Sequence, residues 1–170
     1  MRLPGAIDGF ELAVRVILGQ QVTVKAARTL TERLVQRFGT PIDTPWAGLT
    51  HVFPHVATLA AADPEAIGTL GIVRQRVKAL QALATEVAAD HLHLHRGAPL
   101  EPTLAALLAL PGVGDWTAQV IAMRALAWPD AWPASDIGVM NALGTRDVKE
   151  VSARAEAWRP WRAYATLALW

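Results

Sequence analysis

The feature that most constrains this chain is the stretch Leu110–Ala118, which reads LPGVGDWTA. Apolar residues at helical spacing lie on both sides of it, and Pro102 suits the first position of the preceding helix. Between the two periodic segments, Gly112 and Gly114 allow positive φ and leave no side chain that would hold a ligand away. The stretch therefore predicts two helices joined by a tight hairpin, over about residues 102–127.

The start of the second helix is a candidate anion site. Its first backbone N–H groups have no partner inside the helix, and the helix dipole places partial positive charge at the same end. Backbone donors bind a phosphate without reading a base, so the pattern is typical of a helix–hairpin–helix that holds DNA through one phosphate. An ordinary turn between two helices is the alternative that these residues leave open.

Composition favours packed helices and excludes several kinds of site. Apolar residues make up 52% of the 170 residues, and the absence of cysteine excludes disulfides, thiolate zinc sites, iron–sulfur clusters and a cysteine nucleophile. We find no signal peptide or long apolar run and expect a cytoplasmic protein. The net charge is only +1, but residues 1–40 carry six basic and three acidic groups, so any phosphate-binding face must be local.

Caps and apolar periodicity predict helices along almost the whole chain, and hence an all-α fold. The segment from Thr40 to Pro54 is expected to be a loop. The alternating histidines of residues 91–95 could suggest a metal site, but we interpret them as a solvated connector, because no carboxylate cluster lies nearby. One helix is expected to begin near Gly9, with Asp8 as its cap, and the next to run from Val22 or Thr23 to a stop at Gly39. Further helices are expected over residues 63–70, 72–89, 148–158 and 160–170.

A second informative segment, over about residues 132–143, contains Pro133-Ala-Ser-Asp136. Ser135 or Asp136 can cap the helix that follows, and a cap is the ordinary role of an aspartate there. This aspartate, however, comes about twenty residues after the hairpin and has tryptophans beside it.

The two segments together resemble the helix–hairpin–helix base-excision DNA glycosylases, with their glycine/proline and aspartate signature. The chain is most similar to the 3-methyladenine DNA glycosylase II group, which shares further motifs along the whole chain. These are Leu3-Pro-Gly, Ile17-Leu-Gly-Gln20, Ala60-Ala-Ala-Asp-Pro64, Leu70-Gly-Ile and Trp158-Arg-Pro-Trp-Arg162. The resemblance implies one domain over residues 1–170, made of two helical lobes with the active-site cleft between them. The smaller mixed α/β domain that precedes this part in the family is expected to be absent.

The resemblance also assigns site residues. Asp136 would be the catalytic carboxylate, and Trp116 and Trp170 would be aromatic walls of the base pocket. A monovalent cation could bind the carbonyls of Leu110 and Val113, and no other metal or cofactor is expected. Gln21 stands where the family often has a leucine that is pushed into the DNA stack. The expected DNA contacts are Gln20, Gln21, Leu110, Gly112, Val113, Gly114 and Thr117.

We therefore expect a monomeric repair enzyme of the cytoplasm, at the bacterial nucleoid, that acts on double-stranded DNA with damaged bases. It would flip out alkylated purines and hydrolyse the N-glycosidic bond, leaving an abasic site. Bifunctional members of the family carry a lysine two residues after the second hairpin glycine, where this chain has Trp116, so water is the expected nucleophile. The alternatives are a non-catalytic or lesion-sensing DNA-binding domain, which would not need Asp136, and a helical protein-interaction domain.

Overall fold

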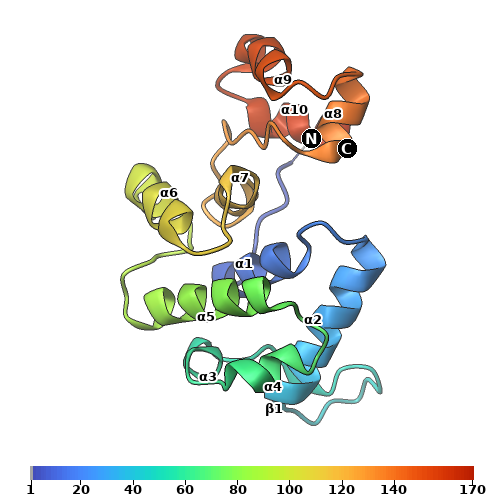
Figure 1. Cartoon of the computed structure of the whole chain (residues 1–170), viewed down its shortest axis with the longest axis vertical. Helices are drawn as coiled ribbons and strands as arrows, with labels where there is room; N and C mark the ends of the chain where they lie inside the picture. The colour runs from blue at the N-terminus through green and yellow to red at the C-terminus, as the bar shows by residue number, and fades with distance from the viewer. Residues whose placement is uncertain (1) are drawn as a thin grey trace.

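The computed structural model describes residues 2–170, and it confirms an all-α architecture (Figure 1). The predicted loop over 40–54 also contains a two-residue antiparallel ladder, β1 Thr40–Pro41 with β2 His51–Val52. The helices are α1 Gly9–Leu18, α2 Val24–Phe38, α3 Val56–Ala60, α4 Pro64–Gly68, α5 Arg74–Ala88, α6 Leu100–Ala109, α7 Asp115–Arg124, α8 Ile137–Leu143, α9 Val148–Ala155 and α10 Arg162–Leu169, with a 3₁₀ turn η1 Glu156–Trp158.

Helix starts follow the capping residues where these exist. Asp8 caps α1, since its Oδ1 accepts hydrogen bonds from the backbone N–H groups of Phe10 and Glu11 at 2.7 and 3.0 Å. The expected start of α6 at Pro102 was wrong by two residues, because α6 begins at Leu100. Proline is tolerated there because the N–H groups of a first helical turn have no intrahelical acceptor.

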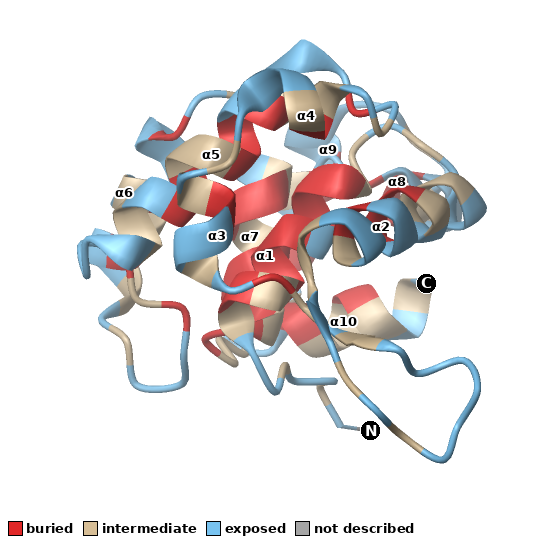
Figure 2. Cartoon of the chain, turned by 90° about the horizontal axis from the view of Figure 1, so that it is seen from below, coloured by how far each residue is buried: buried red, intermediate tan, exposed pale blue. Residues whose placement is uncertain are grey.

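The chain forms two lobes, which Figure 1 shows one above the other, and each has its own core. Figure 2 draws the buried residues in red, many of them in α1, α5 and α7. The large lobe, residues 6–126, buries side chains of α1, α5 and α7 against one another, with Ile17, Leu80 and Ile121 fully buried. The small lobe, residues 128–170, has a core of six buried side chains: Trp132, Ala134, Val139, Met140, Val151 and Ala155. Met123, Ala131 and Ala163 form a third cluster at the junction of the lobes.

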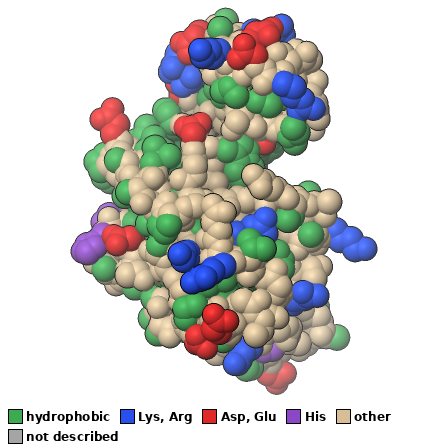
Figure 3. Space-filling model, in the orientation of Figure 1, with side chains coloured by type: hydrophobic (Ala, Val, Ile, Leu, Met, Phe, Trp, Pro, Cys, Tyr) green, Lys and Arg blue, Asp and Glu red, His purple; other side chains and the backbone are tan. Residues whose placement is uncertain are grey.

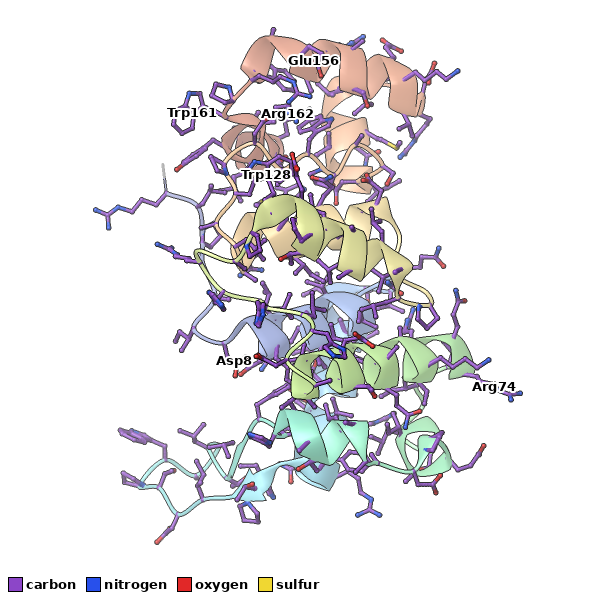
Figure 4. The ribbon with its side chains drawn as sticks, turned by 90° about the vertical axis from the view of Figure 1, so that its left-hand side faces the viewer. Asp8, Arg74, Trp128, Glu156, Trp161 and Arg162 are labelled. Atoms are coloured by element: carbon purple, nitrogen blue, oxygen red, sulfur yellow. The ribbon has the colours of Figure 1, made fainter. Side chains whose placement is uncertain are left out.

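An ion cluster fastens α10 to the segment that leaves the large lobe. Asp130 accepts two hydrogen bonds from Arg162, at 2.7 and 2.8 Å, and one from Arg159 at 2.6 Å. Burial raises the pKa of Asp130, but hydrogen bonds from Arg162 and the positive charges of Arg162 and Arg159 outweigh that effect and leave the pKa below its usual value. Glu156 Oε1 also lies 3.6 Å from Arg162 Nη1, and Figure 4 labels both of these side chains. We refer to Asp130, Arg159 and Arg162 as the clasp.

Acidic and basic side chains are interspersed on the face drawn in Figure 3, as the mild net charge leads one to expect. Along the described residues, none of the helices has the length and apolar character that crossing a membrane requires.

Candidate active site

Asp136 stands at the junction of the two lobes, as the cap of α8. Its Oδ1 accepts hydrogen bonds from the backbone N–H groups of Gly138, at 2.8 Å, and Val139, at 3.0 Å. Of the two caps that the sequence allowed, Ser135 and Asp136, the structure uses Asp136, and the cap fixes the orientation of its carboxylate. Only 8% of the residue is exposed, so its charge is largely shielded from water.

Two tryptophans from different lobes converge on this carboxylate. Trp116, in the first turn of α7, donates its indole N–H to Oδ2 at 2.8 Å. Trp170, which follows α10, donates its indole N–H to Oδ1 at 2.9 Å. The three residues that the sequence placed at the reaction centre thus meet in space, although they are 20 and 34 residues apart along the chain.

The four donors suit an ionised carboxylate, which can only accept hydrogen bonds. Oδ1 accepts three of them, whereas Oδ2 accepts one. Oδ2 therefore keeps capacity for a further partner, such as a water molecule or a cationic centre. The arrangement can hold a negative charge beside a group that becomes positive, with little rearrangement during the reaction.

Gly138 is a site residue that the sequence analysis did not identify. A Cβ atom built on it would lie 3.1 Å from both Asp136 Oδ1 and Trp170 Cδ1, closer than ordinary van der Waals contact. The missing side chain therefore gives the indole of Trp170 room to reach the carboxylate. One signal in the sequence could have indicated this role. Gly138 lies in the first turn of an expected helix, where glycine is less stabilising than alanine.

We expect Gly138→Ala to separate activity from stability. The new methyl group pushes Trp170 away from Asp136, and a displacement at a reacting group lowers the rate, here by about tenfold. Helix propensity favours alanine by up to about 1 kcal/mol, which offsets part of the cost of displacing Trp170, so the unfolding temperature should change little. The measurements are the base release that the sequence resemblance implies, under single-turnover conditions, and thermal unfolding.

The matched control for that variant is Gly68→Ala. Gly68 is also helical, lies in α4 of the large lobe, and has no atom within 4 Å of its built Cβ. Its replacement should leave the rate unchanged. Equal rates for wild type and Gly138→Ala would mean that the contact with Trp170 is not needed.

The hairpin between α6 and α7 presents backbone rather than side chains. Gly112 has φ +77°, a conformation that favours glycine, and Gly114 is the extended residue that precedes α7. The side chains of Leu110 and Val113 are buried in the large core, and the N–H of Val113 donates to the Leu110 carbonyl at 3.2 Å. Any contact of these residues with DNA must therefore come from their backbone atoms.

The remaining expected DNA contacts differ in accessibility. The side chain of Gln21 is exposed, whereas Thr117 is buried, at 2% exposed. The amide nitrogen of Gln20 donates to Thr117 Oγ1 at 2.9 Å and to the Gly112 carbonyl at 3.0 Å. Gln20 and Thr117 thus bond to each other across the fold.

A sequence model described as "HhH-GPD superfamily base excision DNA repair protein" matches residues 14–161. The chain belongs to this family. The relatives of this HhH-GPD chain include "Probable bifunctional transcriptional activator/DNA repair enzyme AlkA" of Mycobacterium tuberculosis, 43% identical over 99% of this chain. They also include "DNA-3-methyladenine glycosylase 2" of Escherichia coli, 36% identical over all of it. The chain spans 34% of the first relative and 60% of the second.

Solved structures share the HhH-GPD fold. The 3-methyladenine DNA glycosylase of Archaeoglobus fulgidus superposes with a TM-score of 0.81 at 23% identity, covering 98% of this chain and 58% of that one. The 8-oxoguanine glycosylase/lyase of Clostridium acetobutylicum, solved with double-stranded DNA, has a TM-score of 0.85 at 17% identity. It covers 99% of this chain and 60% of that one.

Proposed function

We propose that this chain releases alkylated purines, such as 3-methyladenine, from double-stranded DNA by hydrolysing the N-glycosidic bond. The observation that carries the proposal is the carboxylate of Asp136, fixed by two indole N–H groups at the junction of the lobes. Membership of the base-excision family and the glycosylase relatives support it. We further propose that the protein acts as a monomer on chromosomal DNA in the cytoplasm.

The chemistry follows from the charge that develops during bond cleavage. A base inside a duplex is out of reach, so it must be flipped out at a cost of roughly a few kcal/mol. As the bond to the base breaks, the sugar becomes positively charged, and the Asp136 carboxylate stabilises that charge and orients water through Oδ2. A purine alkylated at N3 or N7 is already cationic, which makes it a good leaving group. It also stacks on electron-rich indoles, an interaction worth on the order of 0.5–2 kcal/mol.

The hairpin would hold the DNA backbone. The N–H groups at the start of α7 point out of the turn, and they suit a backbone phosphate whatever the DNA sequence around it. Among the described residues, the Val113 carbonyl has no hydrogen-bond donor and the Leu110 carbonyl has one. We propose that these two oxygens bind a monovalent cation, which would add positive charge near that phosphate.

The direct test is incubation with alkylated duplex DNA, followed by mass analysis of the released bases. We expect free alkylated purines and abasic sites in equal amounts. An absence of released base from a folded, DNA-binding protein would contradict the proposal.

We expect a hydrolytic enzyme without lyase activity. A lyase needs an amine that attacks the sugar, and the indole of Trp116 at the family's lysine position cannot act as one. The nearest lysines in the sequence are Lys78 and Lys149. Borohydride added during turnover should therefore trap no covalent protein–DNA adduct. An adduct that forms in proportion to turnover would contradict the water mechanism.

A further inference from the structure

The turn between α1 and α2 carries an exposed side chain on a strained backbone. Gln21 has φ +51°, a left-handed conformation that residues other than glycine and asparagine seldom adopt. Such a conformation persists only where the surrounding structure imposes it, and it is common at functional sites. The structure should therefore contain contacts that hold the turn in place.

The neighbouring Gln20 makes those contacts with three other parts of the large lobe. Its amide nitrogen donates to the Gly112 carbonyl, at 3.0 Å, and to Thr117 Oγ1, at 2.9 Å, so that both amide hydrogens are used by the hairpin and α7. Its backbone carbonyl accepts a hydrogen bond from Arg76 Nη2 on α5. The three partners lie 56 to 97 residues away along the sequence.

We propose that Gln20 and Arg76 are positioning residues, which fix the exposed Gln21 at a set place relative to the phosphate-binding hairpin. Gln20 then acts through Gln21 rather than by donating its amide hydrogens to DNA. This inference rests on the proposed function, because it assumes that the hairpin binds a phosphate while Gln21 enters the gap that a flipped base leaves. A duplex would meet the hairpin and the side chain in one rigid arrangement.

The consequence is a distinction between two kinds of DNA binding. The hairpin donors are backbone groups, so the affinity for undamaged duplex should depend little on Gln20. Recognition of a gap in the stack requires Gln21 to be in its place, so it should depend strongly on Gln20 and Arg76. The probe for a gap is a duplex that contains a tetrahydrofuran abasic analogue, which needs no catalysis.

The experiment compares Gln20→Met, which keeps the length and removes the hydrogen bonds, with wild type. Dissociation constants are measured for the tetrahydrofuran duplex and for undamaged duplex, and single-turnover base release is measured on alkylated duplex. We expect the preference for the tetrahydrofuran duplex and the release rate each to fall by about tenfold. The affinity for undamaged duplex should stay within about threefold. Gln21→Ala should lose the same preference.

Arg76 is tested by rescue. Arg76→Met should lose the preference, whereas Arg76→Lys keeps a donor for the Gln20 carbonyl and should retain much of it. Arg74→Met removes a charge from the same helix. Arg74 is the first residue of α5, and Figure 4 shows its side chain pointing away from the rest of the protein. An equal loss in Arg74→Met and Arg76→Met would mean that charge alone is responsible, and would overturn the proposal.

Two further results would overturn it. One is a Gln20→Met variant with the preference and rate of wild type. The other is an equal loss of affinity for both duplexes, which would make Gln20 a simple support of the hairpin. Failure of the proposed function looks different, since a wild type that prefers the tetrahydrofuran duplex but releases no base would refute catalysis and leave the positioning test intact.

Discussion

Replacement of Asp136 by asparagine is expected to lower the release of alkylated bases by at least about a hundredfold, the loss typical when a group that stabilises transition-state charge is removed. The amide has the shape of the carboxylate and is itself a good helix cap, so α8 should still form. The asparagine carries no negative charge, however. Its NH₂ group would face the indole N–H of Trp116, which donates to Oδ2 in the wild type, so that two donors would meet. The measurement is single-turnover base release, with affinity for tetrahydrofuran duplex as the test of binding.

A matched control exists in the same lobe. Asp147 caps α9 by accepting from the Lys149 backbone N–H at 2.8 Å, and its side chain is exposed. Asp147→Asn should leave the rate unchanged, because it repeats the chemical change away from the indoles. If Asp136→Asn turned over at close to the wild-type rate, another group would have to be the catalytic one.

Substitution of the hairpin glycines should weaken binding to damaged and undamaged duplexes alike. Alanine at Gly112 is strained by about 1–2 kcal/mol, because the residue has φ +77°. Gly114 has ordinary angles and open space around its built Cβ, so Gly114→Val should fold normally but block the close approach of a phosphate. We expect each variant to lose roughly tenfold in affinity, measured by fluorescence anisotropy over a series of salt concentrations.

The control for backbone strain is Gly144→Ala. Gly144 also has positive φ, +68°, with nothing near its built Cβ, but it lies in the small lobe after α8. It should lose stability without losing affinity for undamaged duplex. Hairpin variants that lost only the preference for damaged DNA would place these glycines in the base pocket instead.

Much of the fold could be predicted from the sequence, because local chemistry determines it. Asp8 and Asp136 specify helix starts through their own side-chain hydrogen bonds, and Gly112 specifies the hairpin through its backbone conformation. The boundary of α6 was wrong because proline is compatible with several positions of a first turn, so Pro102 does not mark one of them. The short ladder between β1 and β2 depends on pairing across a loop, which no local pattern indicates.

The site was predictable only in its local parts. The bonds that Gln20 makes to Gly112 and Thr117, and the bond from Arg76, join residues far apart in sequence, so no spacing rule could reveal them. The role of Gly138 depends on where Trp170 comes to lie after folding. The resemblance to a family placed Trp116 and Trp170 at the reaction centre, but it did not indicate that both indoles donate to the same carboxylate.

The clasp implies that the two lobes differ in how readily they unfold locally. A core of six side chains buries little surface, so the small lobe depends on its junction with the large lobe and on Asp130, Arg159 and Arg162. Amides of α8 and α10 should therefore exchange with deuterium faster than those of α1 and α5. Because the folded-state pKa of Asp130 is lowered, the clasp stabilises the lobe above the unfolded pKa of about 4 and loses this effect as pH falls through the folded pKa. In mild urea or acid the protein should therefore pass through a state in which the hairpin of the large lobe is still folded, whereas Asp136 and Trp170 no longer meet.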